Sequence, residues 1–239
     1  MLSRLLLPPK LTKKDIVLTL LPALLWIGGI HARSHVINAR CAGPVPSCAK
    51  EAVLKIDQAS LGLESSAADG YSYLTQNAAG IVAVSVPAVW NASLFMLGRA
   101  TPAAALIYAG TDLILFMQAF AWNGFIGETV RLISQRPRPF VYADPIGRGL
   151  DPAHYISYYS GHTSFTAAAV TILLLILLGR GATGPVLVVF AGLGQSLILM
   201  TAMFRVLAGR HFVTDVVTAA VAGSLVSLVI ALIHKPKLR

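Results

Sequence analysis

Apolar and polar residues alternate along this chain in long blocks. The apolar runs cover residues 16–32, 80–97, 102–127, 163–178, 185–207 and 213–233. A helix needs roughly 20 apolar residues to cross a bilayer, and somewhat fewer suffice where the bilayer is thin. The pattern predicts an all-α integral membrane protein with six transmembrane helices, folded as a single membrane-embedded domain over residues 1–239.

The first run has a second interpretation. It follows a basic tail, residues 1–15, and an apolar segment after a basic tail is also typical of a secretory signal peptide. No good small-x-small cleavage site follows the run. The five later runs need this one to make an even number of spans, with both termini on one side of the membrane. We therefore interpret it as the first membrane span.

The longest polar connection before the motifs covers residues 33–79. Scattered apolar residues, Val53, Leu54, Ile56, Leu61 and Leu63, occur between charged ones in this segment. Such a pattern is typical of short amphipathic helices that lie in the membrane interface. We therefore predict interfacial helices within a first external loop.

Composition supports the membrane interpretation. Charged residues make up 12% of the 239 residues, about half the share of a soluble domain, and mean hydropathy is +0.71. The net charge of +9 could indicate nucleic-acid binding. Lysines and arginines are concentrated in tails, turns and polar connections, however, without a basic stripe interleaved with exposed aromatics, so we predict no nucleic-acid partner.

The basic residues also indicate an orientation. The tails and two short turns hold Arg4, Lys10, Lys13, Lys14, Arg99, Arg180, Lys235, Lys237 and Arg239, with Asp15 as their only acid. The other side holds about as many basic residues, but it also holds most of the acids, and several of its arginines are candidate site residues. By the positive-inside rule both termini are cytoplasmic. We predict a multi-pass protein of the cytoplasmic (inner) membrane of a bacterium, with residues 33–79, 128–162 and 208–212 outside.

Two cysteines, Cys41 and Cys48, lie in the predicted external loop. An oxidising compartment favours a disulfide between them. Two unpaired thiols are the alternative.

An arginine, a histidine and an aspartate connect the fifth and sixth runs: Arg205, His211 and Asp215. If the chain is helical from His211 on, His211 and Asp215 share one face. The carboxylate can then accept the proton of one imidazole nitrogen and leave the other free to attack. Arg205 supplies a guanidinium suited to phosphate oxygens. A His–Asp surface pair at a membrane interface would look the same, so this stretch alone does not decide the function.

Two more polar segments reach the same predicted surface. Ser160, Gly161 and His162 directly precede a long apolar helix, and free N–H groups at a helix N-terminus make an anion site. Arg131 and Arg138 follow the third run. Three convergent arginines with a helix N-terminus fit a phosphate better than a carboxylate, whereas arginines that only snorkel to lipid headgroups, as expected for Arg99 and Arg180, do not explain the convergence.

These segments resemble the signature of the type 2 phosphatidic acid phosphatase superfamily, the lipid phosphate phosphatases, whose relatives include vanadium haloperoxidases. The family pattern is Lys-x6-Arg-Pro, Pro-Ser-Gly-His and Ser-Arg-x5-His-x3-Asp. This chain has Arg131-x6-Arg138-Pro139, Ser160-Gly161-His162 and Arg205-x5-His211-x3-Asp215. It departs from the pattern at Arg131, which replaces lysine, at Tyr159, which replaces proline, and at Phe204, which replaces serine.

The resemblance implies a role for each matched residue. His211 is expected to be the nucleophile that forms a phosphohistidine, with Asp215 orienting its ring, and His162 the general acid for the leaving group. The phosphate-binding residues are expected to be Arg131, Arg138, Ser160, Gly161 and Arg205. No metal and no cofactor are implied.

The sequence therefore predicts a membrane lipid phosphatase. Its substrate would be a lipid phosphomonoester or diphosphate, such as polyprenyl diphosphate, phosphatidate, phosphatidylglycerol phosphate or lipid A phosphate, hydrolysed at the extracytoplasmic leaflet. A lipid phosphotransferase that uses the same histidine is the alternative. A non-catalytic lipid-phosphate binding or transport protein is a third hypothesis, but it needs no nucleophile and acid pair.

Two acids lie outside the motifs. We expect Asp112, in the middle of the third run, to be hydrogen-bonded in a structural role rather than to carry protons or bind substrate, because a charge within the membrane is costly. We expect Glu128 to pair with a site arginine rather than to act in catalysis. His154, in the same external connection as the second motif, is expected to be a solvated loop histidine.

Overall fold

The computed structural model describes residues 12–41 and 48–234. Within these ranges the chain forms helices and no β-strand. Six helices of the described chain are long and apolar enough to cross a membrane, so the predicted all-α integral membrane fold is confirmed. They are α1 (Lys13–Val36), α3 (Ser66–Met96), α4 (Pro102–Ser134), α7 (Gly161–Gly179), α8 (Gly184–Leu207) and α9 (Val213–Ile233).

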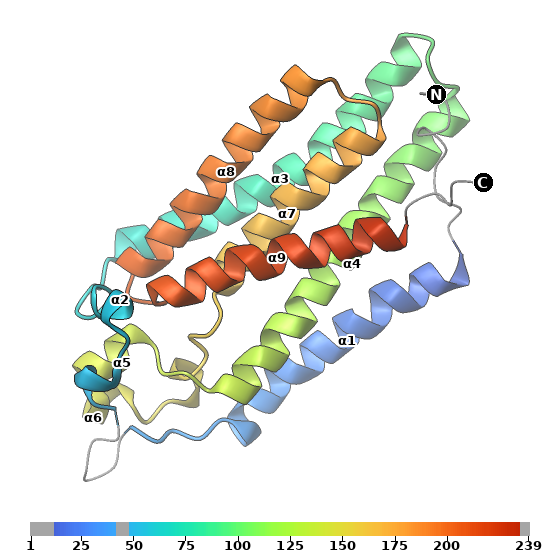
Figure 1. The fold of residues 1–239 in the computed structure, drawn as a ribbon. Coiled ribbons are helices and arrows are strands. Elements are labelled where there is room, and N and C mark those ends of the chain that lie inside the picture. Colours follow the sequence, from blue (N-terminus) through green and yellow to red (C-terminus); the bar gives the residue numbers. More distant parts are fainter. Residues whose placement is uncertain (1–11, 42–47, 235–239) are drawn as a thin grey trace.

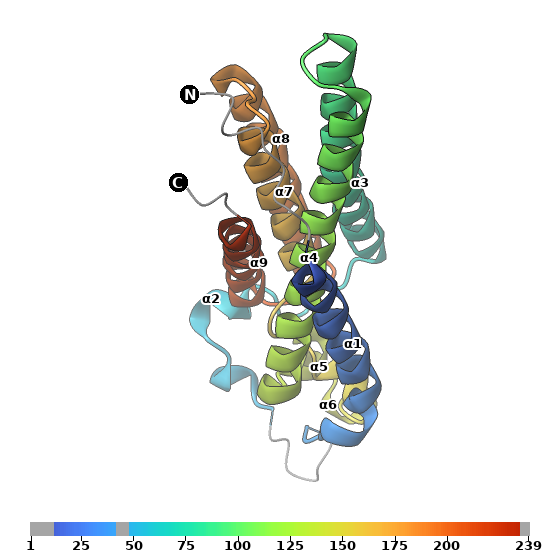
Figure 2. The ribbon, with the colours of Figure 1, turned by 90° about the vertical axis from the view of Figure 1, so that its right-hand side faces the viewer.

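Short elements connect the long helices at one end of the bundle (Figures 1 and 2). The predicted short helices of the first loop are present as η2 (Lys50–Ala52) and α2 (Lys55–Gln58). Between α4 and α7 lie α5 (Pro139–Ala143), α6 (Pro145–Arg148) and η3 (Pro152–His154). Several basic residues used to predict the orientation, Arg4, Lys10, Lys235, Lys237 and Arg239, lie outside the described residues.

Two helix boundaries differ most from the prediction, while α1 extends a few residues beyond its predicted span at each end. Helix α3 begins at Ser66, so residues 66–79 are helical and do not belong to a loop over 33–79. Its first turns are polar, and their partners come from α8: the hydroxyl of Thr201 donates to that of Thr75 at 2.8 Å. Helix α4 likewise continues to Ser134, past the predicted end at residue 127. Hydropathy misses such turns because tertiary partners, not apolarity, stabilise them.

Helix α7 is the central element of the bundle. It is mostly buried and packs against α3, α4, α8 and α9 (Figure 1). Small residues allow this close packing: a Cβ on Gly223 of α9 would lie 2.1 Å from the carbonyl oxygen of Ser164. The amino end of α7 is therefore held rigidly among four helices, and this is the end that carries the second motif.

Helix α1 lies on the outside and packs mainly along α4 (Figure 2). The ring of Trp26 covers Gly124, where an added Cβ would lie 2.3 Å from the indole. Many apolar side chains of α1, such as Leu24 and Ile16, are exposed. In a bilayer these side chains contact lipid, while the other face carries Trp26 and Arg33 to the motif-bearing end of the bundle.

Cys41 and Cys48 form a disulfide, with Cα atoms 5.3 Å apart. Cys41 is buried, and its N–H donates to the hydroxyl of Tyr155 at 2.8 Å. This hydrogen bond connects the start of the first loop to the segment between α4 and α7.

Candidate active site

Six of the eight predicted site residues line one cavity of about 440 Å³. The six are Arg131, Arg138, Gly161, His162, Arg205 and His211. They come from the carboxyl end of α4, the chain before α5, the amino end of α7, the end of α8 and the turn before α9. We call this cavity the phosphate pocket. The three motif segments thus converge, although Arg131 and Arg205 lie 74 positions apart in the sequence.

The ring of His211 is fixed by a backbone carbonyl. Its Nδ1 lies 2.7 Å from the carbonyl oxygen of Ser157, which can only accept, so Nδ1 carries the proton. Nε2 then keeps the lone pair. His211 is 3% exposed, and its burial, together with the charges of Arg205 and Arg138, lowers the pKa of the imidazole to about 3 against the opposing effect of Asp215. The ring is therefore neutral at ordinary pH, with one nitrogen available as a nucleophile.

Asp215 lies beside His211 but not in the place expected from the spacing. Helix α9 begins at Val213, so His211 precedes it, and the carboxylate is 3.8 Å from Nδ1. The expectation that Asp215 accepts the imidazole proton does not match this geometry, because the Ser157 carbonyl oxygen is closer. Asp215 accepts instead from the Ser157 hydroxyl at 2.6 Å and from the N–H of Phe212 at 2.9 Å. It holds in place the loops on both sides of the histidine.

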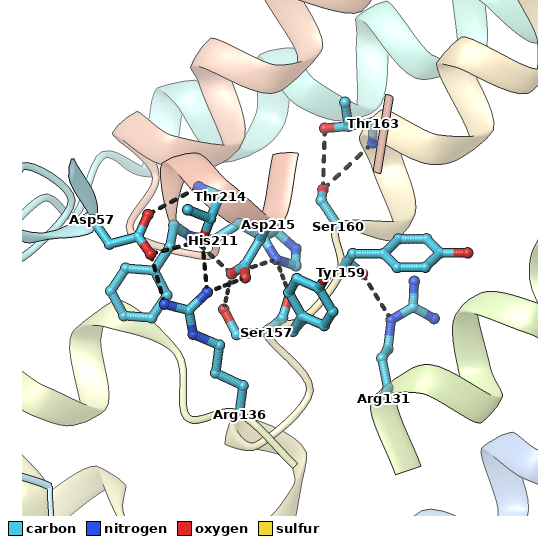
Figure 3. A network of polar contacts seen from close by, with 12 residues as sticks. Asp57, Arg131, Arg136, Ser157, Tyr159, Ser160, Thr163, His211, Thr214 and Asp215 are labelled. Atoms are coloured by element: carbon cyan, nitrogen blue, oxygen red, sulfur yellow. Dashed lines mark hydrogen bonds and ion pairs between the residues drawn. The ribbon is translucent and has the colours of Figure 1, made fainter. Parts of the chain in front are cut away.

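Arg136, which lies between Arg131 and Arg138 in the first motif segment, supports Asp215. Arg136 donates to Asp215 at 2.6 Å and to Asp57 of α2 at 2.7 Å, as Figure 3 shows. Its guanidinium carbon lies 4.1 Å from the centre of the Phe212 ring. Asp57 in turn accepts from the N–H and the hydroxyl of Thr214. The first loop is thereby tied to the turn that carries His211.

The second motif is arranged around the start of α7. The Ser160 hydroxyl accepts from the N–H of Thr163 at 3.4 Å and is fully buried, so it caps the helix and does not line the pocket (Figure 3). Gly161 does line it, and an added Cβ would lie 2.7 Å from a terminal nitrogen of Arg131. A side chain at this position would have to displace the Arg131 guanidinium from the helix N-terminus.

Arg131 is held in position on two sides. Its Nε donates to the carbonyl oxygen of Tyr159 at 3.2 Å, and one terminal nitrogen donates to Glu128 at 3.1 Å. Glu128 is 1% exposed and also forms a two-point ion pair with Arg33 of α1. The expectation that Glu128 pairs with a site arginine is confirmed. Arg33, which sequence reasoning missed, lines the pocket as well.

His162 faces the pocket without a polar partner. Within the described residues its Nε2 is buried and makes no hydrogen bond, and the same holds for Nε of Arg138 and of Arg205. The ring of Tyr73, from α3, packs edge-on against the imidazole with centroids 4.3 Å apart. Since buried polar nitrogens normally have partners, these three nitrogens have hydrogen-bonding capacity left for a ligand.

Positive charge dominates the pocket. Arg33, Arg131, Arg138, Arg205 and Arg210 all line it, while the acids in contact with them are Asp69 and Glu128. One carboxylate, Asp69, serves both Arg205 at 2.6 Å and Arg210 at 2.8 Å. The excess of guanidiniums, with the amino end of α7, favours a group that carries more than one negative charge.

A comparison with protein-family models finds a match to the PAP2 superfamily over residues 112–239, which is more than half of the chain and contains all three motifs. The chain belongs to the PAP2 superfamily. Membership in this superfamily supports phosphatase-type chemistry on phosphate esters. Comparisons with curated proteins and with solved structures gave no match.

Several residues of the pocket lie before the matched part of this PAP2 chain: Arg33, Asp69 and Tyr73 come from α1 and α3. No spacing relates them to the motifs, and Asp69 falls in the stretch interpreted as a loop. Arg136 and Arg210 stand within the motif segments, beside matched residues, and could have been noticed as additional charges there. In the described part of the chain no three or more His, Cys, Asp or Glu side chains form a group that could hold a metal ion.

Proposed function

We propose that this chain is a membrane lipid phosphatase that hydrolyses a phosphomonoester or diphosphate of a lipid through a phosphohistidine on His211. The single observation that carries the proposal is the placement of two histidines in one arginine-lined pocket. His211 has Nδ1 committed to a carbonyl and Nε2 free, and His162 has a buried nitrogen without a partner. Binding alone would need neither.

The chemistry follows from these positions. Nε2 of His211 attacks phosphorus and forms a P–N bond, while the bond from phosphorus to the leaving oxygen breaks. His162, protonated at the start, gives its proton to that oxygen. Water then attacks the phosphohistidine, returns a proton to His162, and the P–N bond breaks to release inorganic phosphate. His211 keeps its Nδ1 proton throughout.

The arginines stabilise the phosphoryl oxygens during both steps. Arg131, Arg138 and Arg205 would hold them, with Gly161 allowing the approach at the amino end of α7. In phosphoryl transfer such positioning and charge stabilisation provide most of the rate enhancement. Ser160 contributes by capping α7 and not by direct contact.

The membrane setting supports a lipid substrate. The apolar side chains Trp26, Ile30, Phe120 and Phe165 line the same pocket as the arginines. We place the pocket at the extracytoplasmic leaflet of a bacterial inner membrane, with both termini in the cytoplasm. The Cys41–Cys48 disulfide supports this orientation, because it lies at the pocket end of the bundle and disulfides persist in oxidising compartments.

The test is to trap the intermediate. Purified protein in detergent is mixed with a lipid phosphate labelled in the scissile phosphate, quenched within milliseconds, and the labelled residue is mapped. We expect acid-labile, base-stable label on His211, and none in His211→Ala. His35→Ala, an exposed histidine on α1, is the matched control and should label normally. Label on His162, or turnover without His211, would defeat the mechanism.

The same preparation separates the alternatives. A phosphatase releases inorganic phosphate, whereas a phosphotransferase yields a phosphorylated lipid acceptor after the same labelled intermediate. His162→Ala should slow alkyl phosphates by orders of magnitude and an activated aryl phosphate much less, because a good leaving group departs without a proton. Lipid binding without label in any variant would favour a binding or transport protein.

A further inference from the structure

A second cavity of about 490 Å³ adjoins the phosphate pocket. Asp69, Tyr73 and Arg210 line both cavities, so the two are separated only by the side chains that they share. The second cavity is lined further by Phe140, Arg148 and His154, and none of its residues takes part in the chemistry proposed above.

The second cavity has a cationic floor, formed by two arginines next to one aromatic ring. The buried ring of Phe140 has the guanidinium carbon of Arg148 at 5.2 Å from its centre and that of Arg210 at 5.8 Å. His154 packs edge-on against the same ring at 4.8 Å, and its Nδ1 lies 2.7 Å from the carbonyl oxygen of Arg148. His154 is thus part of a cavity wall rather than a solvated loop residue. Cation–π contacts therefore place both guanidiniums next to this ring.

The two carboxylates that line this cavity, Glu64 and Asp69, equal its two arginines in number but do not fully neutralise them. Glu64 pairs with Arg148 at 2.7 Å, but its side chain is 60% exposed, and such solvent-exposed pairs are worth little and are readily exchanged. Asp69 is shared between Arg210 and Arg205. One carboxylate therefore serves two guanidiniums at the border between the cavities, and a positive charge is left there for a ligand.

Helix α3 adds to the positive potential. Ser65 and Ser66, at its amino end, line the second cavity, and the Ser65 hydroxyl caps the helix by accepting from the N–H of Ala68. The remaining N–H groups of the first turn have no intrahelical partner, and the dipole of a 31-residue helix places partial positive charge here. The helix end and the two arginines act on the same space.

The leaving group of the reaction points to this cavity. His162, the residue proposed to protonate the leaving oxygen, packs against Tyr73, and Tyr73 lines both cavities. A leaving group that departs past His162 therefore reaches the border that Arg210 occupies. A group attached to the leaving oxygen would lie near Arg210, at the border of the two cavities. A larger group would extend to Arg148, in the second cavity.

We infer that the second cavity is a subsite for a second phosphate, carried by the leaving group of the substrate, with Arg148 and Arg210 as its specificity-determining residues. The inference rests on the proposed function. The shared chemistry is a phosphate near the scissile one, linked to it directly as in a lipid diphosphate, or through glycerol as in phosphatidylglycerol phosphate. In both, the group that leaves after phosphoryl transfer to His211 still carries a phosphate.

The experiment compares matched substrates on the purified full chain: farnesyl diphosphate against farnesyl phosphate, and phosphatidylglycerol phosphate against phosphatidate. The measured quantity is the ratio of kcat/KM within each pair. Arg148→Gln should lower the ratio by about 10- to 100-fold, the value of one charge-assisted contact to phosphate. Arg210→Gln should lower this ratio as well. It should also lower kcat/KM for all four substrates, since Arg210 also lines the phosphate pocket.

Arg99→Gln, an exposed arginine in the turn between α3 and α4, is the matched control and should leave both ratios unchanged. A fall in the farnesyl pair alone identifies the directly linked phosphate, and a fall in the glycerolipid pair alone identifies the glycerol-linked one. Ratios that do not change in Arg148→Gln, with its thermal unfolding unchanged, overturn the subsite while the phosphatase stands. Wild-type protein that hydrolyses none of the four overturns the proposed function itself.

Discussion

Arginines are buried at both ends of this helix bundle, but their surroundings differ. At the end opposite the phosphate pocket, Arg180 lies over the ring of Tyr108 and pairs with Asp112, which also accepts from Asn91 at 2.7 Å. At the pocket end, Arg138 and Arg205 keep Nε atoms without partners in the described chain. One cluster is matched charge for charge. The other has more guanidiniums than carboxylates.

The difference separates structure from function. Asp112 accepts from both Arg180 and Asn91, so the expectation that it is hydrogen-bonded is confirmed. The expectation that Arg180 snorkels to headgroups is wrong, because its side chain is 6% exposed and paired. An excess of buried positive charge is costly unless an anion arrives, and this cost is typical of sites that bind one.

The largest expected effect is on turnover at the pocket end. Arg205→Ala removes a guanidinium that lines the phosphate pocket, and turnover should fall by about 10³-fold, the usual cost of losing a preorganised donor to transition-state charge. Steady-state kinetics of lipid phosphate hydrolysis in detergent measure it. The comparison between the ends fails if Arg205→Ala keeps near-normal kcat/KM.

The matching change at the opposite end should affect stability instead. Arg180→Ala leaves Asp112 buried without its ion pair, which costs about 3–5 kcal/mol of the free energy of unfolding. The fraction that stays folded should hydrolyse substrate at the normal rate. Thermal unfolding and active-site titration separate the two quantities. A folded Arg180→Ala protein with lost turnover would show that the matched cluster acts in catalysis.

The support behind His211 should give an intermediate effect. Asp57→Asn weakens the contact to Arg136, which holds Asp215 and the Phe212 ring. We expect kcat to fall by about 10-fold with KM little changed, since the group acts on the position of the nucleophile and not on the ground-state phosphate. Asp144→Asn, an acid at the start of α6, is the control. A raised KM with normal kcat would place Asp57 in binding.

The pH dependence should show a smaller, qualitative effect. The pKa of His211 is lowered from its ordinary 6.5 to about 3, so its Nε2 stays unprotonated at all pH values well above 3. In His162→Ala acting on an aryl phosphate, the rate should be flat between about pH 5 and 8 once the substrate's own ionisation is divided out. A loss of rate with a midpoint near 6.5 would mean that His211 titrates as an exposed histidine.

The last prediction assigns the two ends to the two sides of the membrane. Asp151→Cys, in the connection at the pocket end, should react with an impermeant thiol reagent added outside intact cells, whereas Arg99→Cys should not. The native cysteines are paired and give no background. The reverse labelling pattern would overturn the orientation without affecting the contrast between the two arginine clusters.

The fold class and most of the residues that line the phosphate pocket at its motifs could be predicted from the sequence. A long apolar run in a bilayer folds as a helix, because a helix forms all of its backbone hydrogen bonds within one segment. Motif spacing identified His162, His211 and the arginines, because ionisable side chains are rare in an apolar chain. Local reasoning also placed Glu128 beside a site arginine, because the two residues lie three positions apart on one helix.

Most contacts of those residues could not be predicted, because they depend on how the helices and loops pack. The spacing of His211 and Asp215 indicated a direct contact, but the turn before α9 gives the imidazole proton to the Ser157 carbonyl and leaves Asp215 to Ser157 and Arg136. Arg33, Asp69 and Asp57 reach the site from segments 70 or more residues before the last motif. Hydropathy and spacing describe neighbours along the chain, whereas hydrogen bonds and ion pairs form between whichever groups packing brings together.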